Sequence, residues 1–301
     1  MSFIVRILNK LARSTSWYKE VMFQDCEKFW RLNDFELDVV SLGSNSAKFG
    51  FDYSNENVKG CNWAMGPQSL QLDLNILQTY YSYLKPGATV IIPLCPFSCL
   101  VGYDYSYWSD KYYTILHHSQ IPCFNIHKRI LMNDIRQNPY RYIPLLQVLK
   151  EMVKKVKHHK ALAIDSDMQM QNNADIFINS WKEQFFLKDF DKELSLLNKH
   201  SYKESQEILF KIVDFCKRYG FTPVIVMPPV SKHLRSRFSK VAMKRLVNDY
   251  VMDAVGKDVR FLNYFSSNDF ESNVYFRNSY FLSESGAKDF TKKVLTDLNL
   301  I

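Results

Sequence analysis

The 301-residue chain contains little glycine and proline, 9 and 10 residues respectively, and no segment is rich in either. This scarcity excludes a fibrous repeat, a low-complexity chain and a long disordered linker. The six cysteines are scattered without a Cys-x-x-Cys pair, a pattern that indicates buried free thiols in a reducing compartment rather than a zinc site. No apolar run is long enough for a transmembrane helix or a secretion signal. We therefore expect a cytoplasmic protein.

Acidic residues are also in deficit, and the formal net charge of +8 favours an anionic partner such as a phosphate or an acidic glycan. The basic runs at 150–160 and 231–245 are typical of solvated helix faces, so we expect no nucleic-acid partner. In the N-terminal helical segment that we expect over residues 1–34, Phe3, Ile7 and Leu11 share one face. That face could pack on the domain or attach peripherally to a membrane.

Residues 35–301 show alternating strand and helix patterns. Apolar runs that end in turn residues predict five strands, at Leu37–Leu42, Val58–Met65, Ala88–Leu94, Thr222–Met227 and Val259–Asn263. Helical spacing of apolar residues predicts helices at Gln68–Leu84, Tyr202–Tyr219, Ser236–Val255 and Ser283–Leu298. The alternation predicts an α/β fold, a three-layer α/β/α sandwich on a five-stranded parallel sheet of flavodoxin-like order 2-1-3-4-5.

Residues 96–200 are too long for a simple crossover between the third and fourth strands. We expect them to form an inserted helical cap over the carboxyl ends of the strands, with helices near Tyr140–Lys157 and Asp175–Leu197. The aromatic tract Tyr103–Asp110 lies in this insertion and could either stack on sugar rings or form a packed wall.

The turn Gly43-Ser44-Asn45-Ser46 follows the first strand, where ligands of open α/β sheets bind. Three interpretations fit it. Its backbone N–H groups could hold an anion, Ser44 or Ser46 could be a nucleophile if a base lies within reach, or a serine could simply cap the following helix.

The order of three further motifs adds a resemblance. Leu42–Ser46 is followed by Gly50-Phe51-Asp52 and then by Asn62–Pro67, and the chain closes with Phe281–Ala287. This order resembles the SGNH (GDSL-like) hydrolase superfamily, in particular the branch found with bacterial capsule, O-antigen and lipoteichoic-acid modification. The resemblance covers Leu37–Leu94 and Phe221–Leu298 and implies acyl-ester hydrolysis or transfer by a serine, histidine and aspartate.

Aligned with that pattern, the triad positions fall on residues that cannot perform the chemistry. The nucleophile position is Asn45, the aspartate position is Asn278 and the histidine position is Phe281, and no histidine follows His233. Phenylalanine cannot accept a proton, so the usual triad mechanism is unavailable. Any catalysis would need Ser44 or Ser46 as nucleophile and a substitute base, for which His233 is the candidate.

The remaining site predictions concern binding. We expect a binding or oxyanion site that comprises Gly43, Asn45, Asn62, Gly66 and Ser98. The histidine pairs at 117–118 and 158–159 are adjacent rather than at ligand spacing, so we expect no metal, and no motif for a cofactor is present.

Three functions follow. The first is an esterase or acyltransferase of bacterial surface-polysaccharide biosynthesis, with a glycan or acyl-glycan substrate. The second is a catalytically degenerate SGNH-fold protein that binds a glycan or anion and contacts a biosynthetic complex. The third is a transferase of an anionic group such as a phosphate ester.

Overall fold

The computed structural model describes residues 25–33, 35–103, 110–121, 124–127, 129 and 166–301, together with positions 3, 7, 10, 11 and 14. The chain divides into two compact units, one of residues 1–33 and 108–161 and the other of residues 34–107 and 162–301. Most of the expected N-terminal segment and the helix expected near Tyr140–Lys157 lie outside the described residues. In the first unit, the described elements are α2 (Glu27–Trp30) and two short 3-10 helices (Asp110–Thr114 and His118–Gln120).

The second unit is built on a sheet of five parallel strands in the order β2-β1-β3-β4-β5. The strands are β1 (Leu37–Ser41), β2 (Gly60–Asn62), β3 (Leu84–Pro93), β4 (Thr222–Met227) and β5 (Arg260–Asn263). The prediction of a three-layer α/β/α sandwich on a five-stranded parallel sheet, with its strand order, is confirmed.

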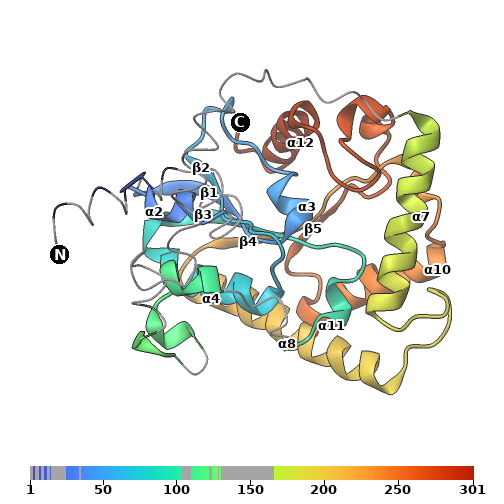
Figure 1. The fold of residues 1–301 in the computed structure, drawn as a ribbon, viewed down its shortest axis with the longest axis horizontal. Coiled ribbons are helices and arrows are strands. Elements are labelled where there is room, and N and C mark those ends of the chain that lie inside the picture. The colour runs from blue at the N-terminus through green and yellow to red at the C-terminus, as the bar shows by residue number, and fades with distance from the viewer. Residues whose placement is uncertain are drawn as a thin grey trace. The chain divides into compact units, whose positions relative to one another are not determined.

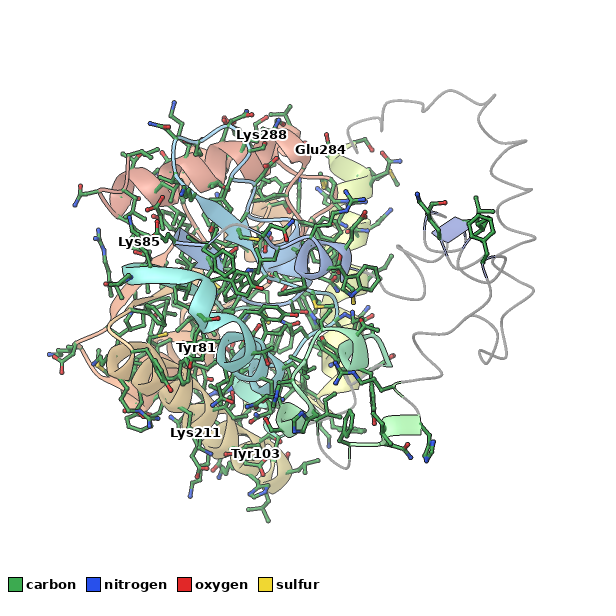
Figure 2. The ribbon with its side chains drawn as sticks, turned by 90° about the vertical axis from the view of Figure 1, so that its left-hand side faces the viewer. Tyr81, Lys85, Tyr103, Lys211, Glu284 and Lys288 are labelled. Carbon is green, nitrogen blue, oxygen red and sulfur yellow. The ribbon has the colours of Figure 1, made fainter. Side chains whose placement is uncertain are left out.

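Helices cover both faces of this sheet (Figure 1). On one face lie α3 (Asn45–Lys48) and α12 (Glu284–Asp297), and on the other lie α4 (Leu70–Tyr80), α8 (Leu196–Arg218) and α11 (Tyr250–Val255). The core of the first face joins sheet residues such as Val39 and Ile91 to Phe290 and Val294 of α12. On the second face Tyr81, labelled in Figure 2, packs edge-on against Phe215 of α8.

Asp38 near the start of β1 is held by two basic neighbours. Lys85 at the start of β3 forms an ion pair with Asp38 of β1, and Asp38 also accepts the Lys59 N–H at 2.8 Å.

Lys211 of α8 contacts Tyr103, at the start of the aromatic tract, both through the Tyr103 hydroxyl and over the Tyr103 ring (Figure 2). The rest of the tract expected to follow, residues 104–109, lies outside the described residues.

Several helix boundaries differ from their predictions, and serine caps explain the differences. The helix expected over Asp175–Leu197 is instead α7 (Asp167–Gln184), which begins at a capping box formed by Ser166 and Gln169. The chain then breaks, and α8 starts after the cap at Ser195. The helix expected over Ser236–Val255 consists of α10 (Lys240–Met243), a π-helix (Lys244–Asp249) and α11, and the short α9 (Lys232–Arg235) precedes it. Within the described ranges, no helix combines the length and apolarity needed to cross a membrane.

Candidate functional site

A cavity of about 270 Å³ lies at the carboxyl ends of β1 and β3. Its lining includes the turn Gly43–Ser46 after β1 and, after β3, Cys95 and Ser98. In the sheet, β2 pairs with one edge of β1 and β3 pairs with the other edge. The order in which the chain adds strands to the sheet therefore reverses between β1 and β3. Open α/β sheets bind ligands at such a switch point. The cavity is therefore the candidate site.

The turn after β1 is held in one conformation by its own backbone and by Gln68, two residues before α4. Gly43 has a φ of +110°, and a Cβ there would lie 2.8 Å from the Cβ of Ala47, so only glycine fits without strain. The Ser44 hydroxyl accepts the Gln68 N–H at 3.1 Å, and Gln68 Nε2 donates to the Gly43 carbonyl at 3.1 Å. These bonds fix Ser44 at the wall of the cavity.

Asn45 lies directly over Gly66. A Cβ built on Gly66 would lie 1.7 Å from Asn45 Oδ1, so any side chain at that position would displace Asn45. Asn45 and Ser46 line the cavity, whereas Gly66 does not. Gly66 thus acts by leaving room for Asn45 rather than by touching a ligand.

Asp73 is the buried carboxyl group of the cavity. Its side chain is 2% exposed, and Oδ1 accepts the Gly43 N–H at 2.7 Å and a hydrogen bond from Gln68 Nε2. Burial raises the pKa of Asp73 to about 7, and the two hydrogen bonds only partly oppose that rise. The cavity therefore contains a carboxyl group that changes charge near neutral pH.

Ser69, the residue before α4, has an unsatisfied hydroxyl. It is 3% exposed and lines the cavity, yet its Oγ has no hydrogen-bond partner and does not cap the helix. A buried hydroxyl without a partner is unfavourable, and such groups are uncommon in folded proteins. The hydrogen-bonding capacity of the Ser69 hydroxyl is thus unused within the described part of the protein.

Aromatic side chains, which we call the aromatic wall, form another part of the cavity lining. The ring centroid of Tyr280 lies 5.3 Å from that of Phe177 and 5.0 Å from that of Trp181, both in α7. The ring centroid of Phe281 lies 5.8 Å from that of Phe177. Phe97, after β3, completes the cluster 5.0 Å from Trp181. The site therefore combines a polar wall of serine and amide groups with an aromatic wall.

Two residues expected at the oxyanion site are already engaged within the protein. Asn62 Nδ2 donates to the carbonyls of Ala47 at 3.0 Å and Phe51 at 2.8 Å, and its Oδ1 accepts the Ala64 N–H at 3.0 Å. These bonds tie the end of α3 to β2, and Asn62 does not line the cavity. Ser98 does line it, with a hydroxyl that accepts the Cys95 N–H at 2.9 Å and contacts Cys95 Sγ at 3.4 Å.

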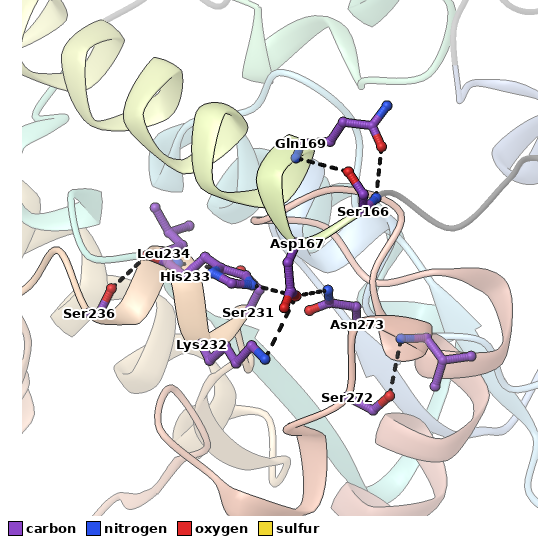
Figure 3. Close-up of polar contacts among 11 residues, drawn as sticks. Ser166, Asp167, Gln169, Ser231, Lys232, His233, Leu234, Ser236, Ser272 and Asn273 are labelled. Carbon is purple, nitrogen blue, oxygen red and sulfur yellow. Dashed lines mark hydrogen bonds and ion pairs between the residues drawn. The ribbon is translucent and has the colours of Figure 1, made fainter.

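His233, the expected substitute base, belongs to a different cluster (Figure 3). Its Nε2 lies 3.1 Å from Oδ1 of Asp167, which also accepts Asn273 Nδ2 at 2.6 Å and lies 3.7 Å from Lys232 Nζ. These contacts hold the pKa of Asp167 below its ordinary value, with the Asn273 bond the largest cause. The cluster joins the start of α7 to α9. His233 does not line the cavity that contains Ser44 and Ser46.

Of the three triad positions, Asn45 and Phe281 line the cavity. Asn278 does not line it and precedes Phe281 by three residues. The Asn278 Oδ1 accepts the backbone N–H groups of Tyr280 at 3.0 Å and Phe281 at 2.7 Å, which fixes the turn that presents Phe281. Among the described residues, no histidine lines the cavity. Asn45 and Phe281 thus line one cavity although they lie far apart in the sequence.

Sequence reasoning did not identify Ser69, Asp73 or Trp181 as site residues. A signal for the first two was present, since they lie four residues apart at the start of a helix that follows a strand, on a face that is otherwise apolar. Trp181 carried no such signal, because only the three-dimensional path of α7 brings it to the sheet edge.

Other candidate groups give no second centre. The described residues contain no group of three or more His, Cys, Asp or Glu side chains that could hold a metal ion. Among the described cysteines, Cys26, Cys99 and Cys216 are buried. Of the two basic runs, residues 150–160 lie outside the described residues, while Arg235 and Arg237 in the second run form ion pairs with Glu271 and Asp175. Comparison with protein-family models and with curated proteins found no match to this chain.

Proposed function

We propose that this chain is a catalytically degenerate SGNH-like protein that binds a glycan at the β1–β3 switch point, in the context of bacterial surface-polysaccharide synthesis. The observation that carries the proposal is the lining of the cavity, which combines aromatic side chains with serine and amide groups and contains no histidine among the described residues. Aromatic faces and hydroxyl or amide side chains are suited to the apolar faces and hydroxyl groups of a sugar ring.

The size of the cavity supports the same ligand class. Its volume of about 270 Å³ lies just below the roughly 300–1,000 Å³ of pockets for drug-sized ligands, so it suits a group the size of one sugar ring. No lysine or arginine lines it among the described residues, so the lining does not favour an anionic group as the transferred species. The basic charge of the chain lies elsewhere.

Hydrolysis or acyl transfer is the second candidate, because Ser44 and Ser46 both line the cavity. A serine nucleophile needs a base, and loss of a triad member lowers the rate by several orders of magnitude. A fluorophosphonate probe and an aryl acetate separate the two functions. We expect neither labelling of Ser44 or Ser46 nor turnover above the background rate. Stoichiometric labelling of either serine would establish the catalytic alternative.

Binding is tested with a panel of methyl glycosides by saturation-transfer NMR and titration calorimetry. The Trp181→Ala variant should weaken binding about tenfold, because it removes one ring of the aromatic wall. The matched control is Phe186→Ala, which removes an aromatic ring just after α7 that is 78% exposed and does not line the cavity. Equal effects of the two variants, or no binding of any glycoside to the unaltered protein, would contradict the proposal.

A further inference from the structure

Two groups at the start of α4 have unused hydrogen-bonding capacity. The Ser69 Oγ is buried in the cavity lining without a partner. Asp73 lies one helical turn further on, and both of its hydrogen bonds use Oδ1, so Oδ2 has no hydrogen-bond partner in the described part of the chain. The Asp73 N–H bonds to the Ser69 carbonyl at 3.0 Å, which fixes the two residues relative to each other.

We propose that Ser69 and Asp73 together form a subsite that binds one hydroxyl group of an uncharged sugar and rejects anionic sugars. This inference rests on the proposed glycan-binding function of the cavity and specifies its ligand. A ligand hydroxyl can accept a hydrogen bond from Ser69 and at the same time donate one to Asp73 Oδ2, because a hydroxyl is both donor and acceptor.

The charge state of Asp73 narrows the ligand class. Since the pKa of Asp73 is raised to about 7, the carboxyl group is partly protonated near neutral pH. A hydroxyl fits both forms, because it can donate to the carboxylate or accept from the carboxylic acid. An ammonium group fits only the ionised form, and a carboxylate or phosphate group fits only the protonated form. Only an uncharged hydroxyl is compatible with the site across this pH range.

No other charge in the lining compensates that of Asp73. The groups that bond to it, the Gly43 N–H and the Gln68 amide, are neutral. The other titratable side chains that line the cavity among the described residues are the Cys95 thiol and the Tyr280 phenol, and no lysine, arginine, histidine or glutamate does so. Above pH 7 an anionic ligand would therefore face an ionised carboxylate with no cation beside it.

The experiment compares neutral methyl hexosides with their uronic-acid counterparts by calorimetry at pH 5.5 and 8.5. The neutral glycosides should bind at both values with affinities that agree within about threefold. The uronic acids should lose at least about tenfold in affinity as the pH rises through 7, because Asp73 becomes charged. In Asp73→Asn, which keeps an acceptor oxygen for Gly43 and Gln68, this loss should disappear.

Ser69→Ala tests the other half of the subsite without risk to the fold. It should weaken binding of neutral glycosides about two- to tenfold, the effect of one lost hydrogen bond. Its melting temperature should equal or exceed that of the unaltered protein, because the removed hydroxyl has no partner. If neutral glycosides bind but both variants match the unaltered protein, and uronic acids bind equally at both pH values, the subsite is wrong and the proposed function stands. If no glycoside binds, the proposed function fails as well.

Discussion

The chemistry of the cavity depends at the residue level on which polar groups are already satisfied. Asn62, at the end of β2, was expected as an oxyanion donor, but its Nδ2 already donates to the carbonyls of Ala47 and Phe51, and its Oδ1 accepts the Ala64 N–H. Ser69 and Asp73 keep unused oxygens in the cavity lining. Such differences arise from side-chain direction, which residue spacing along the sequence does not specify.

Asn62→Asp tests the structural role of Asn62. The substitution replaces the donor Nδ2 with an oxygen that faces the carbonyls of Ala47 and Phe51, so two acceptors lose their partner and a charge is added. We expect the free energy of unfolding to fall by about 2–4 kcal/mol, measured by urea denaturation at pH 7.5. Glycoside affinity of the folded fraction should stay within about twofold of that of the unaltered protein. A loss of affinity with unchanged stability would instead assign Asn62 to the binding site.

Asp73 predicts a pH dependence of stability. Its folded-state pKa of about 7 lies above the ordinary 3.8, so the folded protein binds the proton more tightly than the unfolded chain does. This contribution to stability is fully present below about pH 4 and is lost as the pH rises to about 7. The difference corresponds to about 4 kcal/mol at most. Urea denaturation from pH 4 to 8 should therefore show a smaller fall in stability for Asp73→Asn than for the unaltered protein. Parallel curves would contradict the assignment.

Among the elements, α7 decides how the cavity is closed. It supplies Phe177 and Trp181 to the aromatic wall, and its polar side contacts two later segments. Asn173 Oδ1 accepts both the N–H and the hydroxyl of the fully buried Ser279, at 3.3 and 3.1 Å. Because Ser279 precedes Phe281 by two residues, this contact connects α7 to the turn that carries Phe281.

Asn173→Ala and Asp175→Ala are matched changes on this helix. The first leaves a buried N–H and hydroxyl of Ser279 without their acceptor, and we expect a loss of about 1–3 kcal/mol in the free energy of unfolding. The second removes an exposed ion pair with Arg237 and should leave stability unchanged within error. Both are measured by chemical denaturation. A larger effect from Asp175→Ala would show that surface charge, rather than the Ser279 contact, holds α7.

Elements with a strong local signal were predicted well, and those set by capping were not. Thr222–Met227 was predicted with its observed bounds because an apolar run lies between Gly220 and Pro228, which mark both ends. The break expected between Leu197 and Tyr202 lies instead between α7 and α8, because apolar residues continue past Gln184 while the Ser166 and Ser195 caps determine where the helices start. Hydrophobic periodicity indicates that a helix exists more reliably than it indicates where the helix begins.

For the whole molecule, the parallel topology brings together residues from both ends of the chain. The turn at residues 43–46 and the segment at 280–281 line one cavity although more than two hundred residues separate them. Strand order and the rule that ligands bind beyond the carboxyl ends were sufficient to predict that this turn lies at the switch point of the sheet, where the cavity is found. The contribution of α7, which lies inside the expected insertion, could not be predicted from the sequence. No local sequence pattern indicates which helix of a long insertion packs beside the carboxyl ends of the strands.

This convergence leads to a test of the resemblance itself, by reconstruction of the triad. Asn45→Ser, Asn278→Asp and Phe281→His are combined in one protein, because Asn45 and Phe281 line the same cavity. If the alignment is correct, the serine introduced at position 45 should react with a fluorophosphonate probe, and aryl-acetate hydrolysis should exceed that of each single variant at least about 100-fold. Triad members act as a unit, so single substitutions should stay at the background rate. Urea denaturation of the triple variant must show a cooperative transition, so that a lack of activity cannot be ascribed to unfolding. A folded triple variant that neither reacts with the probe nor hydrolyses the ester would show that these three positions do not have triad geometry, and the SGNH resemblance would then lose its support at the site.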